Sequence, residues 1–285
     1  MNEITMQAFA KINLSLRVQG RRADGYHDLR MVMQTLDLHD TLVFRMTEDG
    51  RIVLHTDADV PTDGSNLIVR AASALLDKYA PAVGVEIDLY KHIPIAAGLA
   101  GGSADAAAAL RALRMLFALP VTDAELAAIG LTLGADVPYC LMGGSRLAEG
   151  VGEKLTVLPD MPPCAVLLAK PPVAVSTAEV FRAFRGPYMA EDADWAALLA
   201  RGDLREVAVA MRNDLEAVTI AMHPVIADIK ACMMASGAAG SMMSGSGPTV
   251  FGLFASREEA VLAEVVLRER FPSVREVYVS SIDSE

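Results

Sequence analysis

A run of very small residues between two differently patterned segments constrains this chain more than any other feature. Residues 94–104 read Pro-Ile-Ala-Ala-Gly-Leu-Ala-Gly-Gly-Ser-Ala, after a segment of strand character and before one of helical character. Small side chains let the backbone approach a ligand closely, and a following helix directs N–H groups and the positive end of its dipole into the same space. The run therefore predicts a phosphate-binding loop. The alternative is a flexible turn that permits tight helix packing.

A second glycine loop lies in the other half of the chain, at residues 243–251, where a predicted strand begins. Taken alone, it is equally typical of a tight hairpin turn. Together, the two loops suggest a phosphate site that is closed from both sides where two domains meet. The Walker A, Rossmann and protein-kinase signatures are absent from the sequence, so those nucleotide-binding folds are not indicated.

The charge of the chain requires that any anionic ligand be held locally. The sequence has 25 Lys and Arg against 36 Asp and Glu, which gives a formal net charge of −11. Nucleic acids and membrane surfaces are bound mainly through Lys and Arg, so we expect neither as a partner. A few basic side chains and backbone N–H groups must then hold a bound phosphate.

Composition and cysteine usage predict a soluble, cytoplasmic protein. Hydrophobic residues make up 53% of the chain, which is enough for a sizeable core. Cys140, Cys164 and Cys232 are widely spaced and odd in number, which is typical of thiols in a reducing compartment. The sequence opens without a signal-peptide pattern, and its longest uncharged stretch, residues 231–256, is too rich in glycine for a membrane span.

Hydrophobic periodicity predicts a mixture of strands and helices in the first half of the chain. Strands are expected at residues 8–18, 31–38, 41–46, 51–56 and 83–90, with a turn at 21–25. A helix is expected over 66–79, and another from Ala104 until Pro120. Thr122 and Glu125 form a capping-box pattern for a third helix, which Gly134 would end.

The second half opens after Pro159, Pro162 and Pro163, which are suited to a domain boundary. Strands are expected at residues 165–169, 249–254 and 274–280, with a helix over 256–271. Because the strands do not form repeated βαβ units, the pattern predicts a two-domain α+β fold, with domains at residues 1–158 and 159–285.

The two glycine loops resemble the second and third motifs of the GHMP kinase superfamily, which includes galactokinase, homoserine kinase and mevalonate kinase. Four more segments narrow the resemblance, at residues 8–14, 22–27, 133–138 and 170–181. They are similar to the superfamily members that act on 4-diphosphocytidyl-2-C-methyl-D-erythritol in the non-mevalonate isoprenoid pathway. The matching segments follow the family's order from Lys11 to about Phe251.

This resemblance implies a fold and a reaction. The expected fold has an N-terminal domain like ribosomal protein S5 domain 2 and a ferredoxin-like C-terminal domain. The expected reaction is ATP-dependent phosphorylation of the 2-hydroxyl of the methylerythritol group. Mg²⁺ is expected to accompany ATP, held mainly by phosphate oxygens and water, without a permanent metal site.

Several residues are implied to bind ATP. They are Asn66, Lys91, Pro94, Ile95, Ala96, Ala97, Gly98, Leu99, Ala100, Gly101, Gly102, Ser103, Ala104, Gly245, Ser246 and Gly247. Asn66 is equally suited to capping a helix, and Lys91 to being an ordinary charge at a strand end. The family commonly has a second serine where this chain has Ala104, so only Ser103 can supply a hydroxyl to phosphate or Mg²⁺.

Lys11 and Asp136 are the implied catalytic residues. Lys11 lies on the polar side of the first predicted strand, where a solvated lysine is the alternative. A cation beside the reacting hydroxyl would stabilise developing negative charge and keep a neighbouring carboxylate ionised. Asp136 is the implied general base, although helix capping is its alternative. The sequence leaves open whether Asp136 removes the proton or chiefly orients the oxygen.

The implied acceptor site contains Asn13, Tyr26, His27, Thr177 and Phe181. Tyr26 and Phe181 are expected to stack around cytosine, with His27 hydrogen-bonded to its polar edge. A homoserine- or mevalonate-type kinase remains an alternative, as does a non-catalytic ATP-binding sensor on the same fold. We expect a monomer or weak homodimer.

Overall fold

The computed structural model describes residues 2–80, 82–188 and 192–282. The chain divides into two compact units that interleave along the sequence. The first unit comprises Met1–Ala10, Leu38–Ile95 and Ala100–Gly143, and the second comprises Lys11–Asp37, Ala96–Leu99 and Gly144–Glu285. The expected single boundary between residues 158 and 159 stays a prediction.

Two long strands pass from one unit into the other. They are β1 (Glu3–Arg21) and β2 (His27–Thr47). We expected two strands over the second of these segments, at residues 31–38 and 41–46. That expectation was wrong: β2 is continuous, because the carboxylate of Asp40 is buried and accepts hydrogen bonds instead of turning the chain out to solvent.

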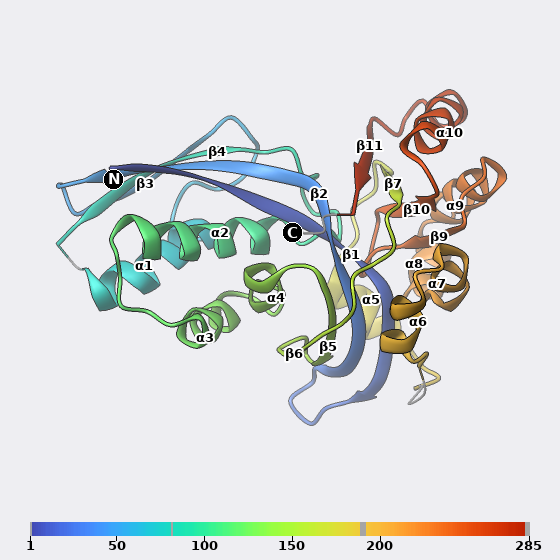
Figure 1. The fold of residues 1–285 in the computed structure, drawn as a ribbon, viewed down its shortest axis with the longest axis horizontal. Helices are drawn as coiled ribbons and strands as arrows, with labels where there is room; N and C mark the ends of the chain where they lie inside the picture. The colour runs from blue at the N-terminus through green and yellow to red at the C-terminus, as the bar shows by residue number, and fades with distance from the viewer. Residues whose placement is uncertain (1, 81, 189–191, 283–285) are drawn as a thin grey trace. The chain divides into compact units, whose positions relative to one another are not determined.

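The first unit is a sheet covered by helices. β4 (Gly84–Tyr90) pairs antiparallel with residues 41–47 of β2, and β3 (Ile52–Thr56) pairs parallel with β4. The helices are α1 (Leu67–Tyr79), α2 (Gly101–Leu116), α3 (Asp123–Leu133) and α4 (Val137–Met142). Figure 1 shows α1 and α2 along one face of these strands. The shared core includes Phe44, Ile87 and Leu110.

The helix ends follow the capping signals in the sequence, with one correction. Thr122 and Glu125 form the predicted capping box of α3, and Gly134 ends that helix. The predicted start of α2 at Ala104 was wrong, since the helix begins at Gly101. Glycine is a poor helix former, but packing of the following buried alanines decides the start here.

The second unit carries a hairpin and a second sheet. The hairpin strands β5 (Ser145–Gly150) and β6 (Lys154–Val157) pair with each other, and β5 pairs with residues 29–34 of β2. β8 (Arg212–Asn213) lies parallel to β1 at residues 15–16. The separate antiparallel sheet has the order β11-β7-β10-β9.

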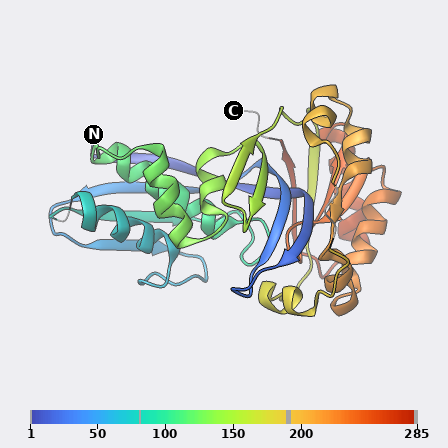
Figure 2. The same cartoon turned by 90° about the horizontal axis from the view of Figure 1, so that it is seen from below.

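That sheet and its helices form the expected ferredoxin-like arrangement. Its strands are β7 (Ala165–Lys170), β9 (Gly240–Met243), β10 (Val250–Phe254) and β11 (Glu276–Ser281). The unit's helices are α5 (Thr177–Ala183), α6 (Trp195–Arg201), α7 (Leu204–Ala210), α8 (Glu216–Met222), α9 (Val225–Ala235) and α10 (Arg257–Arg270). In Figure 2, the orange and red helices cover one face of this sheet. Ile229, Phe254 and Leu267 lie in the buried core.

In the described part of the chain, no single helix is both long and apolar enough to cross a bilayer. There, only α8 and α9 taken together have the necessary length and apolarity, and the two helices are bent by 115° where they meet.

Candidate functional site

The second glycine loop is a hairpin turn that joins β9 to β10. The N–H of Ser244 donates to the carbonyl of Thr249 at 2.9 Å, and that of Gly247 donates to the carbonyl of Ser244 at 2.9 Å. Gly245 and Gly247 have positive φ angles of 59° and 92°, which favour glycine. The hairpin alternative therefore describes the local form of this loop correctly.

The two glycine loops nevertheless contact each other inside the second unit. The Ser244 hydroxyl donates to the carbonyl of Gly98 at 3.0 Å. A Cβ added to Gly98 would lie 2.5 Å from the Ser244 carbonyl oxygen, so a side chain at this position would clash with backbone. Glycine at position 98 therefore allows the backbones of the two loops to approach each other closely.

Lys11 and Asn13 of β1 lie beside the same contact. The backbone N–H of Lys11 donates to the Leu99 carbonyl at 3.1 Å, and its Nζ donates to Asn13 Oδ1 at 2.7 Å. A Cβ on Gly245 would lie 3.6 Å from Asn13 Oδ1. Lys11 is only 4% exposed. The alternative of a solvated lysine is therefore wrong.

The first glycine loop has an unusual backbone conformation. Alternate residues Ala96, Gly98 and Ala100 have φ angles of 53°, 75° and 59°. A left-handed conformation costs an alanine about 1–2 kcal/mol, so two such alanines mark a backbone shape that the fold imposes. Successive N–H groups in such turns can converge on one anion.

The start of α2 presents backbone donors that no side chain caps. Its N-cap residue, Ala100, has no side chain that can accept from the first N–H groups of the helix. These donors and the helix dipole suit an anion. A Cβ on Gly134 would lie 3.7 Å from Ser103 Oγ, so the Ser103 hydroxyl lies beside the segment that leads to Asp136.

Asp136 occupies the N-cap position of α4 without using its carboxylate as a cap. Its carbonyl accepts from the Cys140 N–H at 3.0 Å, but its side chain makes no cap hydrogen bond. The alternative therefore predicted the N-cap position and the proline of the first turn correctly, but the carboxylate does not serve as the cap.

Lys91 lies in a buried ion cluster of the first unit. Its Nζ pairs with Asp40 and, at 2.8 Å, with Asp105. The other oxygen of Asp40 accepts from the N–H groups of His92 and Ile93 at 2.6 and 2.8 Å. A Cβ on Gly101 would lie 3.3 Å from Lys91 Nζ. Lys91 is thus no ordinary strand-end charge, because it links β2 and the residue that follows β4 to the second turn of α2.

Burial sets the protonation of this cluster. Burial raises the pKa of Asp105 to about 7 from its ordinary 3.8, with Lys91 opposing the shift and Asp40 adding to it. Burial disfavours the Lys91 cation, but the two carboxylates outweigh that effect and raise its pKa. Within the described residues, Asp105 Oδ1 is buried without a hydrogen-bond partner. The cluster therefore favours a proton on Asp105 near neutral pH.

Asn66 caps α1, as its structural alternative predicted. Its Oδ1 accepts from the Ile68 N–H at 2.8 Å, and its Nδ2 donates to the Pro61 carbonyl at 2.6 Å. A contact between Asn66 and adenine stays a prediction.

The acceptor residues of the second unit fall into two groups. The rings of His27 and Phe181 stack, with centroids 5.1 Å apart and planes at 25°, whereas Tyr26 is 67% exposed. The hydroxyl of Thr177 is hydrogen-bonded to that of Ser246 at 2.7 Å. The contact joins a residue expected at the acceptor to one expected at ATP.

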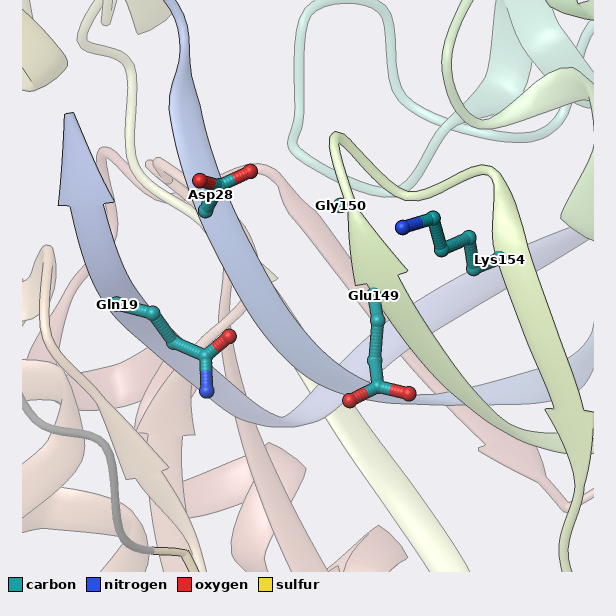
Figure 3. A pocket seen from close by; sticks show the side chains of 5 residues that line it. All are labelled: Gln19, Asp28, Glu149, Gly150 and Lys154. Atoms are coloured by element: carbon teal, nitrogen blue, oxygen red, sulfur yellow. The ribbon is translucent and has the colours of Figure 1, made fainter. Parts of the chain in front are cut away.

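A separate polar pocket of about 420 Å³ lies in the second unit. Gln19, Asp28, Glu149, Gly150 and Lys154 line it, and none of them is a predicted site residue. Figure 3 shows these residues, with Lys154 at the start of β6. In the described ranges, no group of three or more His, Cys, Asp or Glu side chains is placed to hold a metal ion.

Sequence reasoning missed the residues whose side chains support the predicted site residues through buried ion pairs and hydrogen bonds. Asp40 and Asp105 are buried, and Asn213 and Thr219 bond to the second glycine loop. A lone carboxylate among the alanines of α2 was a usable signal for Asp105. Asn213 left no such signal, because its role depends on contacts across 30 or more residues.

Comparisons with known proteins agree with this geometry. The chain matches the model of the GHMP kinases N terminal domain over residues 66–144 and that of the GHMP kinases C terminal domain over residues 195–273. It is 46% identical to a 4-diphosphocytidyl-2-C-methyl-D-erythritol kinase of Lachnospira eligens, over 98% of each chain. It is 49% identical to the enzyme of the same name from Pelotomaculum thermopropionicum, over 90% of this chain and 91% of that one.

Solved structures show the same similarity. A crystal structure of 4-(cytidine 5'-diphospho)-2C-methyl-D-erythritol kinase has a TM-score of 0.84 and 37% identity, covering 99% of this chain and all of the other. A homoserine kinase from Cytophaga hutchinsonii has a TM-score of 0.79 at 21% identity, covering 100% of this chain and 96% of that one. At that identity, the second likeness shows only that the fold is shared.

Proposed function

Because this chain belongs to the 4-diphosphocytidyl-2-C-methyl-D-erythritol kinases, a branch of the GHMP kinase family, we propose that it transfers the γ-phosphoryl group of ATP to the 2-hydroxyl of 4-diphosphocytidyl-2-C-methyl-D-erythritol. The observation that carries this proposal is 46% identity over 98% of the chain to a relative of that name. The reaction is a step of the non-mevalonate route to isoprenoid precursors.

In this proposal, backbone N–H groups supply most of the hydrogen bonds to the triphosphate. Phosphoryl transfer needs positioning and charge stabilisation more than covalent chemistry from the protein. The alternating left-handed residues 96, 98 and 100 and the uncapped start of α2 offer N–H groups in place of basic side chains. Gly245, Ser246 and Gly247 complete the nucleotide site in this proposal.

Asp136 and Lys11 act on the acceptor hydroxyl. The oxygen of the 2-hydroxyl forms a bond to the γ-phosphorus, while the bond between that phosphorus and the β,γ-bridging oxygen breaks. The Asp136 carboxylate accepts the proton of the hydroxyl. The Lys11 ammonium stabilises the charge that develops at the attacking oxygen, and Asn13 holds that ammonium in place. In a loose transition state, the proton leaves late and Asp136 first orients the oxygen.

The remaining acceptor residues recognise the cytidine diphosphate. His27 and Phe181 already stack on each other, which supports a flat aromatic platform for cytosine. Tyr26 is exposed and free to lie over the base from its other side. Thr177 links this group to the second glycine loop through Ser246.

Mg²⁺ would arrive with ATP and neutralise the charge of its β- and γ-phosphates. The donor set fits such a visiting ion, because Ser103 offers one hydroxyl beside the Gly134–Asp136 segment and phosphate oxygens and water can supply the rest. Ala104 removes the second hydroxyl that relatives commonly place there.

We further propose that the protein is a cytoplasmic monomer or weak homodimer that binds neither nucleic acid nor membrane. The acidic charge supports this, since a surface of net charge −11 repels polyanions.

The decisive experiment is product analysis with purified protein, ATP, Mg²⁺ and 4-diphosphocytidyl-2-C-methyl-D-erythritol. We expect phosphorus NMR to show a new monophosphate ester and ADP. Homoserine and mevalonate, tested in parallel, should remain unmodified. A monophosphate ester formed from either of them instead would favour the other kinase type, and no product from any acceptor would favour the sensor.

A further inference from the structure

We propose that Asn213 is a positioning residue for the nucleotide site, because its side-chain amide fixes the backbone of the second glycine loop. This inference deepens the proposed function and rests on it. Asn213 Nδ2 donates to the carbonyls of both Met243 and Gly245 at 2.8 Å. Its Oδ1 accepts from the Leu215 N–H at 3.0 Å, which fixes the orientation of the amide. Nδ2 thus donates to two backbone carbonyls, and Oδ1 accepts from one backbone N–H.

The hairpin does not need these bonds in order to close. Its own backbone already supplies the bonds from Ser244 N–H to the Thr249 carbonyl and from Gly247 N–H to the Ser244 carbonyl. The segment from Asn213 to Thr219 adds a second layer of side-chain bonds to the same few residues. We infer that this layer sets the orientation of the loop's peptide groups.

Neighbouring side chains in this segment support that reading. Glu216 Oε1 accepts from the Met243 N–H at 2.8 Å, and Thr219 Oγ1 donates to the Ser246 carbonyl at 3.2 Å. Lys230 pairs with Glu216 and so holds that carboxylate in place. The side chains of Asn213, Glu216 and Thr219 therefore all hydrogen-bond to the backbone of residues 243–246. These residues are distant from them in the sequence.

The planarity of the peptide bond explains what this grip achieves. In a trans peptide, the carbonyl of one residue and the N–H of the next point in opposite directions. Holding the Gly245 carbonyl toward Asn213 therefore directs the Ser246 N–H away from Asn213. Gly245 has no Cβ to restrict its backbone and has a positive φ of 59°, so without this bond its peptide group could rotate more easily. The Ser246 N–H would then no longer be held in the direction of a bound phosphate.

The test replaces Asn213 with aspartate, which keeps the size and the acceptor oxygen but removes both donors. Binding of Mg²⁺ with a non-hydrolysable ATP analogue is measured by calorimetry without acceptor, and steady-state kinetics are measured separately. For Asn213→Asp, we expect analogue binding and the KM for ATP to weaken by about tenfold or more, because two hydrogen bonds become repulsive contacts. The kcat at saturating ATP should change less than the KM.

Ser241→Ala is the matched control. Ser241 donates to the Phe251 carbonyl at 3.0 Å in the same strand pair, outside the loop. We expect this variant to lose some thermal stability and to bind the analogue within about twofold of wild type. If Asn213 were only structural, both variants would lower stability and the amount of active enzyme, and both would leave nucleotide affinity unchanged.

Two outcomes would overturn the inference. The first is Asn213→Asp protein that is folded and binds the analogue like wild type. The second applies if that variant does not fold: Thr219→Val, which removes one donor to the same loop, would then have to show unchanged affinity. Failure of the proposed function is a different result, since wild-type protein that binds the analogue but does not phosphorylate the acceptor leaves the Asn213 result readable.

Discussion

Asp136 is placed where a carboxylate ordinarily accepts hydrogen bonds from a helix, yet it leaves that task to its backbone. Its carbonyl begins the hydrogen-bond ladder of α4, and proline at the second helical position needs no N–H partner. The carboxylate is therefore not the cap of α4. This is compatible with the role in proton transfer that we propose for it.

His27 gives the residue-scale prediction about specificity. Burial, aided by the charge of Arg21, lowers the pKa of His27 below its ordinary 6.5, so the ring is neutral at pH 7. A neutral imidazole can hydrogen-bond the edge of cytosine and stack on Phe181. We therefore expect His27→Ala to raise the KM for the cytidine substrate about tenfold, with much less effect on the KM for ATP. Steady-state kinetics with each substrate varied in turn measure both values. Equal increases in the two would contradict a contact with cytosine.

At the scale of elements, the start of α2 depends on the ion cluster beneath it. Asp105 comes from the second turn of the helix, Lys91 follows β4 and Asp40 lies within β2. One buried cation thus joins three elements near the start of α2. Removing a single partner from such a cluster leaves an uncompensated buried charge.

The protonation of Asp105 predicts a pH dependence of stability. Its pKa is about 7 in the folded protein against 3.8 as the ordinary value, so between these limits the unfolded chain ionises while the folded protein keeps its proton. The contribution of Asp105 to stability is complete below about pH 4 and is lost as the pH rises through 7. Asp105→Asn has no such loss. We expect the stability of the variant relative to wild type to increase from pH 4 to pH 8 by on the order of 1 kcal/mol or more.

Chemical denaturation at several pH values measures this difference. Asp77→Asn is the control, because Asp77 is an exposed carboxylate on α1 in the same unit. Its stability curve should run parallel to that of wild type. A parallel curve for Asp105→Asn as well would contradict the assignment of the proton to Asp105.

Most of these elements could be predicted from local sequence signals. The alternation in β1, the capping box of α3 and the Ser256 start of α10 each depend on residues close in the chain. The continuity of β2 could not be predicted, because it depends on Asp40 finding partners more than 50 residues away. The early start of α2 failed for a related reason, since tertiary packing overrides the low helix propensity of Gly101 and Gly102.

Site residues were predictable where a motif carries them and not where tertiary contacts do. The glycine loops, Lys11 and Asp136 were all visible as motifs. The contact between Ser244 and Gly98, and the grip of Asn213 on Gly245, join segments that share no pattern. Sequence thus indicated the residues that we propose to contact the ligand, and the residues that hold these in place could be identified only from the structure.

At the scale of the whole molecule, the proposed function requires an acidic protein to bind a triphosphate. The chain has a net charge of −11, so backbone donors must do what lysines do elsewhere. Such donors carry no net charge and add no long-range attraction for polyanions. This supports the proposal that the protein binds a small nucleotide and not nucleic acid.

The proposed reaction assigns Lys11 and Asp136 to one and the same transition state. Residues that act on one transition state are not independent, so the loss of either one should remove most of what the pair contributes.

A double-mutant cycle of Lys11→Met and Asp136→Asn, measured as kcat with both substrates saturating, tests this claim most directly. We expect each single variant to lose about 10²–10⁴-fold in kcat, and the double variant to lose little more than the worse single one. Calorimetric binding of both substrates should stay near that of wild type in Asp136→Asn, which shows that the variant is folded. Near-normal turnover of Asp136→Asn, or losses that simply multiply in the double variant, would contradict the account.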